Sequence, residues 1–296
     1  MAAVYTYALV VFGGIVRISG SGMGCGDDWP RCNGEWIPTF TLETFIEYMH
    51  RLLAAGIGLV ILAVLGYAWM QRGRPGIAGR DGVLRPLALA GVLLIAQALL
   101  GAITVRLELP TEVTVAHFVT AMVFMGVLIV AAVRGGIFGD PAGGADRRDF
   151  RLALAATVIG FLVVGFGAVT ANLPGAPAAC TGFPLCSGAL LPPAGALPAE
   201  VHWAHRLAAF ALFALSAGAA WATRRAPTSR RLRVAAFTAT GLIATQLGVA
   251  AALVLARLPQ SLQALHLAVG AAVWFALVVW VALARRELVA LRHPLT

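Results

Sequence analysis

The sequence has no lysine, and only 12% of its 296 residues are charged. Soluble domains carry about 25% charged residues, so this scarcity excludes a water-soluble globular protein. Hydrophobic residues make up 60% of the chain, and the apolar runs reach the ~20 residues that a helix needs to cross a bilayer. Within a bilayer the backbone must satisfy its own hydrogen bonds, which favours helices. The sequence therefore predicts an all-α integral membrane protein.

All 22 basic residues are arginine, and they give the chain a net charge of +9. Most of them lie in short segments between apolar runs, where the positive-inside rule places them. The charge therefore does not indicate a nucleic-acid partner, and the partner that it does indicate is the lipid bilayer. We expect eight transmembrane helices, at about residues 2–19, 46–70, 84–105, 112–133, 151–171, 201–223, 233–256 and 261–284.

The placement of arginine also predicts the orientation of the chain. The segments after the second, fourth and sixth spans, with the C-terminal tail, hold 16 of the 22 arginines, which makes these segments cytoplasmic. Both termini are then cytoplasmic, and the long loops at residues 20–45 and 172–200 face outward, in a multi-pass protein of the cell membrane. The first span has no basic segment before it and no small-residue cleavage site after it, so we expect a retained helix.

The two halves of the chain repeat one another. Gln97 and His117 recur as Gln246 and His266, and both offsets (246 − 97 and 266 − 117) are 149. A constant offset across two spans indicates an internal repeat. Each half has an even number of spans, so both halves have the same orientation. We therefore expect two tandem four-helix bundles related by a pseudo-twofold axis along the membrane normal.

The domain boundaries follow from this repeat. The N-terminal bundle is expected at residues 1–134 and the C-terminal bundle at residues 151–296. A polar, glycine-rich cytoplasmic linker at residues 135–150 joins the two bundles.

Four histidines lie within about two turns of the outward ends of the even-numbered spans: His50, His117, His205 and His266. Helices that face each other in a bundle can hold a cofactor between inward-pointing side chains, and two imidazoles per half suit the two axial positions of a haem iron. A zinc site would need three or four ligands in one place, whereas these histidines are divided two and two. The alternative that stays open is a structural histidine that bonds a neighbouring helix.

Glu47 lies three residues before His50, and the two side chains share a helix face. His202 takes the matching place in the second half. A carboxylate beside a cofactor can act as a general base or stabilise a developing positive charge, so Glu47 is the candidate catalytic residue. An interfacial glutamate that faces water is the alternative. His202 could support a residue of the site or be an interface residue, and we expect the latter.

Three arginines lie near the outward ends of spans: Arg17, Arg51 and Arg206. Arginine is the best side-chain donor to a carboxylate, so these residues are candidate contacts for haem propionates. Their alternative role is to extend toward lipid headgroups.

The four cysteines fall into one pair in each outward loop, Cys25 with Cys32 and Cys180 with Cys186. Disulfides persist in the oxidising compartment that these loops face. Structural disulfides are one interpretation, and a redox-active first pair is the other. The spacings differ from the C-x-x-C of thioredoxin-like motifs.

Together these features resemble the haem A synthase family, membrane enzymes that make haem A from haem O for terminal oxidases. The resemblance rests on the glycine- and cysteine-containing run from Gly14 to Gly34 and on the Glu-Tyr-Met-His-Arg motif at Glu47. It also rests on Gln97 with the Ala-Leu-Leu-Gly-Ala-Ile-Thr-Val segment after it, on His117, and on the second-half counterparts. It covers nearly the whole chain, and the second cysteine pair is similar to the subgroup with a disulfide in each half.

The resemblance implies an oxidoreductase that converts a methyl group of haem O to a formyl group by successive hydroxylations. It implies that His205 and His266 bind a haem b cofactor, and that His50 and His117 lie at the substrate haem O site. Glu47 would be the catalytic carboxylate, and the first cysteine pair is implicated in activity.

The resemblance also makes haem O synthase and terminal-oxidase assembly factors candidate partners, and a homo-oligomer is a further candidate. Two other functions stay open on the residues alone. A di-haem electron carrier would need the same four histidines but no substrate. An outward-facing thiol-disulfide oxidoreductase would use the cysteines.

Overall fold

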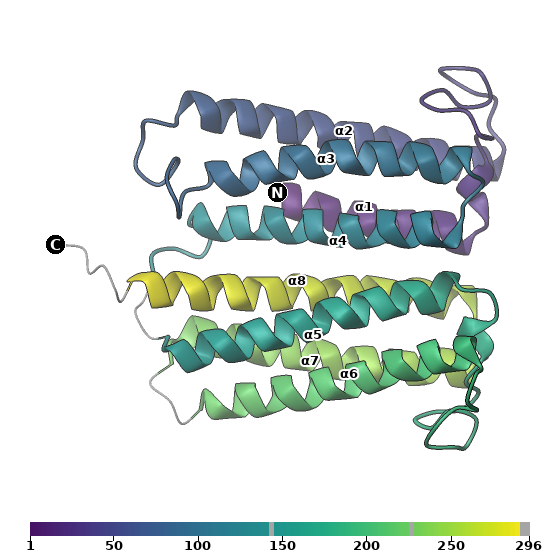
Figure 1. Ribbon diagram of the computed structural model, residues 1–296. Coiled ribbons are helices and arrows are strands. Elements are labelled where there is room, and N and C mark those ends of the chain that lie inside the picture. Colours follow the sequence, from purple (N-terminus) through teal and green to yellow (C-terminus); the bar gives the residue numbers. More distant parts are fainter. Residues whose placement is uncertain (142–144, 225–227, 291–296) are drawn as a thin grey trace. The chain divides into compact units, whose positions relative to one another are not determined.

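The protein is described from a computed structural model, which covers residues 1–141, 145–224 and 228–290. The chain forms eight α-helices over these residues, as the apolar runs predict (Figure 1). They are α1 (Ala2–Ile18), α2 (Leu42–Met70), α3 (Leu84–Arg106), α4 (Thr111–Arg134), α5 (Arg147–Asn172), α6 (Leu197–Ala222), α7 (Arg230–Leu255) and α8 (Gln260–Ala290). Seven are long and apolar enough to cross a membrane, and α1, with 17 residues, is shorter. The predicted all-α membrane fold is confirmed.

Several helices begin or end outside the predicted spans. The helix α2 begins at Leu42 instead of residue 46, because the Thr41 hydroxyl accepts the Thr44 N–H at 3.2 Å and caps the first turn. Asp146 caps α5 in the same way through the Asp149 N–H, at 2.8 Å. With 29 residues, α2 is about 44 Å long, whereas the hydrocarbon core is about 30 Å thick. Hydropathy reports only the part of such a helix that lies in lipid.

Two compact units divide the chain, residues 1–131 and residues 132–296. The first unit contains α1 to α4. Within it α2 contacts α1 and α3, and the Gln97 amide of α3 donates to the His117 carbonyl of α4 at 3.0 Å. The Tyr5 hydroxyl of α1 donates to the Leu53 carbonyl of α2 at 2.9 Å.

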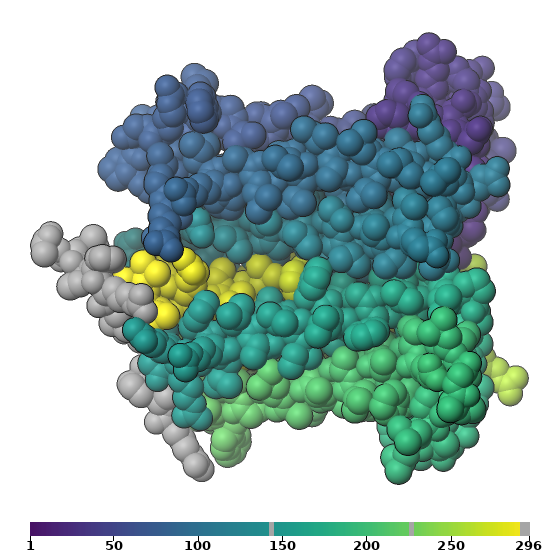
Figure 2. All heavy atoms as spheres, in the orientation of Figure 1, coloured from purple at the N-terminus to yellow at the C-terminus, as the bar shows by residue number. Residues whose placement is uncertain are grey.

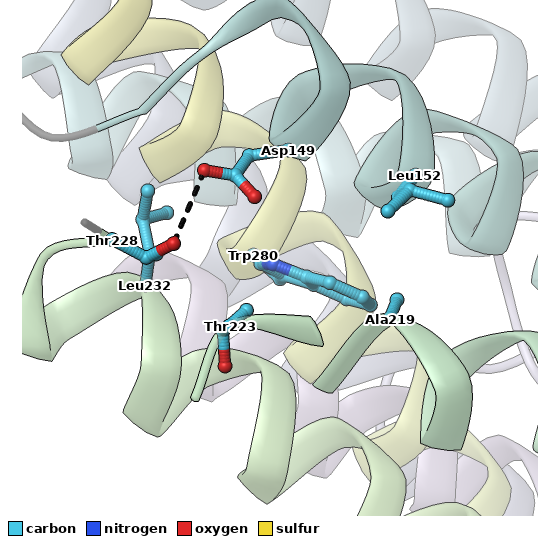
Figure 3. Close-up of a pocket in the computed structure, with 7 residues that line it drawn as sticks. All are labelled: Asp149, Leu152, Ala219, Thr223, Thr228, Leu232 and Trp280. Carbon is cyan, nitrogen blue, oxygen red and sulfur yellow. Dashed lines mark hydrogen bonds between the residues drawn. The ribbon is translucent and has the colours of Figure 1, made fainter. Parts of the chain in front are cut away.

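The second unit contains α5 to α8, packed as a closed ring in which each helix contacts two others. At the end away from its disulfide loop, a small pocket brings all four helices together; it is lined by Asp149, Leu152, Ala219, Thr223, Thr228, Leu232 and Trp280 (Figure 3). The Thr228 hydroxyl donates to Asp149 at 3.4 Å, as the dashed line in Figure 3 marks. Nearby, the Ser229 hydroxyl donates to the buried Glu287 carboxylate at 2.7 Å. This polar cluster closes one end of the bundle, and the histidines lie toward the other end. Two of the arginines behind the predicted orientation, Arg225 and Arg292, lie outside the described residues.

Each unit carries one long loop, between α1 and α2 or between α5 and α6. Figure 2 shows the first loop as a purple knob that stands out to the side of the helices at one end. Disulfides close both loops as predicted, Cys25–Cys32 and Cys180–Cys186, each with a Cα–Cα distance of 4.4 Å. Both loops begin with a short 3-10 helix after a glycine with positive φ, Gly20 in the first unit. The repeat seen in the sequence thus extends to the backbone of the loops. Below, the "loop end" of a unit means the end that carries its disulfide loop.

Candidate functional site

Two histidine rings face each other near the loop end of the second unit. His205 on α6 and His266 on α8 have ring centroids 6.4 Å apart, with planes at 75°. Two metal–imidazole bonds of about 2 Å on opposite sides of one iron, plus the half-width of each ring, place the centroids about 6 Å apart. The separation of these two rings therefore fits two axial ligands of one haem iron.

A backbone carbonyl holds the His205 ring. The Val163 carbonyl of α5 lies 3.1 Å from His205 Nδ1, and because a carbonyl can only accept, Nδ1 carries the proton and donates. Nε2 of the neutral ring then keeps its lone pair, which is the state of a metal-ligating histidine. One turn further along α5, Gly167 leaves the space for the ring: a Cβ there would lie 2.9 Å from His205 Cε1.

Glutamines support the fourth-helix histidine in both units. In the second unit the Gln246 amide donates to the His266 carbonyl at 2.9 Å and lies 3.1 Å from His266 Nδ1. In the first unit Gln97 makes the matching bond to the His117 carbonyl. In both units, therefore, a glutamine of the third helix hydrogen-bonds the backbone of the fourth.

The first unit repeats this arrangement with differences. A Cβ on Gly13 of α1 would lie 3.0 Å from His50 Cε1, so Gly13 has the place of Gly167. A Cβ on Gly101 would lie 3.4 Å from His117 Cε1. The Nδ1 atoms of His50 and His117 are both buried without a hydrogen-bond partner. Buried polar nitrogens are rarely left in this state, so these atoms fit a site that a bound group completes.

These observations agree with the donor set of a six-coordinate haem. Each unit carries one histidine on its second helix and one on its fourth, and a glycine on its first helix lets a ring approach the backbone closely. No group of three or more histidine, cysteine or acidic residues that could hold a metal ion occurs in the described parts of the chain. The residues therefore fit haem better than a zinc ion held by protein side chains.

Glu47 lies one turn nearer the loop end than His50, and both its oxygens are engaged. Oε1 accepts from Nε of Arg51 at 3.1 Å and from a second nitrogen of that guanidinium, and Oε2 accepts the Cys25 N–H at 2.8 Å. Its side chain is only 4% exposed, and that of Arg51 is 15% exposed. The carboxylate therefore connects the helix that carries His50 to the disulfide loop.

Arg51 also holds the loop backbone directly. One guanidinium nitrogen donates to the carbonyls of Asp28, at 2.7 Å, and of Arg31, at 2.8 Å. In the second unit Arg206 donates to Gly182, at 2.9 Å, and to Leu185, at 2.8 Å. Both acceptors are offset by 154 from their first-unit counterparts (182 − 28 and 185 − 31). We call this repeated contact the loop clamp.

The two clamps differ at one position. Arg206 turns its other terminal nitrogen to the Cys180 carbonyl, at 2.9 Å, where Arg51 meets the Glu47 carboxylate. His202, the counterpart of Glu47, is 5% exposed, and its Nδ1 lies 2.9 Å from the Ala176 carbonyl. It is therefore a buried, bonded side chain and not the interface residue that was expected.

The propionate contacts expected of Arg17, Arg51 and Arg206 stay predictions, and the structure gives the latter two a partner set that the sequence did not indicate. The sequence also carried no sign that the carbonyls of Val163 and Ala176 would bond His205 and His202. A backbone acceptor leaves no signal in residue type. The glycines opposite the histidines could be found, because a repeated glycine in an apolar helix indicates close approach.

Taken together, the fold and the site define a multi-pass helical membrane protein with two repeat-related histidine pairs suited to haem. Comparison with known proteins shows the family to which the chain belongs. The family model of the cytochrome oxidase assembly protein COX15-CtaA matches residues 1–44 and 37–278, and the chain belongs to this family. It is 34% identical over 270 residues to the heme A synthase of Symbiobacterium thermophilum, covering 87% of this chain and 84% of the relative. It is 30% identical over 236 residues to the heme A synthase of Bacillus licheniformis, covering 76% and 74%.

Proposed function

We propose that the protein is a haem A synthase, an oxidoreductase that converts a methyl group of haem O to a formyl group in successive hydroxylations. The observation that carries this proposal is the pair of histidines on the second and fourth helices of both units, with a buried carboxylate, Glu47, one turn from the second-helix histidine in the first unit, where the second unit has His202. Curated relatives of this name cover most of the chain. A symmetric electron carrier would have no use for Glu47 in one unit and His202 in the other.

The two histidine pairs take different haems in this proposal. His205 and His266 hold a haem b cofactor, supported by the 6.4 Å separation of their rings and the hydrogen bond that sets the His205 tautomer. When bound, haem b supplies one-electron redox chemistry. His50 and His117 position the substrate haem O, and the partnerless Nδ1 atoms of both are consistent with a site that its ligand completes.

Glu47 is the catalytic carboxylate of the proposal, and its contacts suggest how it acts. Both oxygens accept hydrogen bonds, one from the Cys25 N–H and one from Arg51, so the carboxylate has a fixed direction. A fixed negative charge stabilises positive charge that develops on a nearby substrate. The ion pair with Arg51 keeps that charge in place in a site that is largely removed from water.

Location and partners follow from the proposed activity and from the distribution of arginine. We place the protein in the plasma membrane with both termini cytoplasmic, and with the disulfide loops and haem sites toward the outer side. Arg17 on α1, with Arg51 and Arg206, is a candidate contact for the haem propionates. Haem O synthase and terminal-oxidase assembly factors are candidate partners, and a homo-oligomer is a candidate assembly.

Pigment analysis of the purified protein tests the function. Haem A or a hydroxylated intermediate in the extract, formed from added haem O, is the expected result. Two haem b per chain with no conversion of haem O would contradict it and indicate an electron carrier. A Cys180→Ser variant that keeps full conversion of haem O would separate haem chemistry from thiol oxidation by the second disulfide.

A further inference from the structure

The charge next to the first ligating histidine differs between the two units. In each unit an arginine directly follows that histidine and has little contact with solvent: the side chain of Arg51 is 15% exposed, and Arg206 is buried, at 7% exposed. Both donate to the same pair of repeat-related loop carbonyls. The clamp therefore places a guanidinium in an equivalent position in both units.

Only the first unit neutralises this cation with a carboxylate. Glu47 accepts two N–H groups of Arg51, so the pair carries no net charge. In the second unit the matching residue is His202, whose Nδ1–H donates to the Ala176 carbonyl. Within the described residues no ion pair joins Arg206 to a carboxylate, and its hydrogen bonds go to backbone carbonyls.

The other charged residues at the loop ends also make the second unit more positive than the first. Residues 17–51 and 106–112 of the first unit hold seven carboxylates and four arginines, a net charge of −3. The matching residues 171–206 and 255–261 hold one carboxylate and two arginines, a net charge of +1. Exposed charges are screened by salt, whereas a buried charge acts at a lower effective dielectric constant. Arg206 therefore contributes most to the difference.

We propose that the residue one turn nearer the loop end than the first ligating histidine, Glu47 or His202, sets the reduction potential of the haem in its unit. It does so by neutralising the adjacent buried arginine or by leaving that charge uncompensated. A positive charge disfavours the ferric state, which carries one more positive charge than the ferrous state, and net charge near the iron is one of the determinants of haem potential. With the same haem in both units, the second unit has the higher potential. This inference rests on the proposed haem sites.

Exchanging the residue between the units tests the proposal. The protein is purified, saturated with added haem b, and titrated electrochemically while its absorption spectrum is recorded. His202→Glu supplies Arg206 with the carboxylate that Arg51 has, and the potential of the second-unit haem is expected to fall. His202→Gln is the matched neutral control and should leave the potential close to that of the wild type. Equal shifts in the two variants, or no shift in either, would overturn the proposal.

The reciprocal change keeps the test decisive if His202→Glu loses its haem. Glu47→Gln removes the carboxylate and leaves Arg51 charged, so the potential of the first-unit haem is expected to rise while that of the second unit stays constant. An unchanged first-unit potential would contradict the proposal. Failure of the haem assignment itself has a separate signature, because the wild type would then bind no haem at the histidine pairs at all.

Discussion

The contact between Gly167 and the His205 ring gives a sharp prediction. Carbon atoms pack best at about 3.5–4.0 Å, and the Cβ of a Gly167→Ala variant would lie 2.9 Å from Cε1 and 3.4 Å from Nδ1. The ring must therefore move away by roughly 0.5–1 Å. This movement stretches the 3.1 Å bond to the Val163 carbonyl past hydrogen-bonding distance, which costs about 1 kcal/mol. It also misdirects Nε2, and lost orientation of a metal-ligating histidine typically weakens binding about 10- to 100-fold.

Gly165→Ala is the matched control, because a Cβ at Gly165 meets nothing within 4 Å. The same substitution in the same helix should leave haem binding unchanged and stabilise the helix by about 0.5–1 kcal/mol. The assay is haem b content per purified chain, followed by titration of the depleted protein with haem b. Equal haem affinity in the two variants would refute the assignment of the Gly167 slot to a ligating His205.

Three further changes test the remaining contacts. Glu47→Gln should leave haem b bound and lower conversion of haem O by about 10²- to 10³-fold, the usual effect of losing one fixed electrostatic group; full turnover in a pigment assay would remove Glu47 from the chemistry. Arg206→Met removes charged hydrogen bonds that contribute about 1.5–3 kcal/mol each. Because water replaces part of the lost hydrogen bonding, hydrogen exchange in residues 173–196 should speed up by about 100-fold. Unchanged protection would show that the loop clamp is dispensable. Cys25→Ser should cost about 2–3 kcal/mol of loop stability and reduce conversion through Glu47, whereas Cys180→Ser should cost similar stability and spare conversion. Equal activity losses would argue against this difference between the loops.

The helices were predictable because the signal for a membrane helix lies in composition alone. The run from Ile57 to Ala68 has no charged residue, and in lipid a single such segment satisfies its backbone hydrogen bonds only as a helix. Helix ends were less predictable, since hydropathy falls where the chain leaves hydrocarbon and not where the helix stops. The cap at Thr41 and the extension of α8 to Ala290 lie in that region.

Side-chain roles were predictable where both partners are side chains and not where one partner is the backbone. The repeat placed His205 and His266 on facing helices, and their rings do lie together. Arg206 donates to the carbonyls of Gly182 and Leu185, which the preference of arginine for carboxylates did not indicate, and its propionate contact stays a prediction. Nothing in the sequence indicates where backbone carbonyls converge, because every residue type has one.

The same fact gives the loop clamp a consequence for how the two loops can diverge. A guanidinium that binds carbonyls does not distinguish Asp28 from Gly182 or Arg31 from Leu185. The shape of each loop is therefore independent of most of its side chains. One disulfide loop can gain acidic residues and the other can lose them while the backbone of both loops keeps the same path. The clamp thus separates the architecture of the repeat from its electrostatics, and the two halves could specialise without refolding.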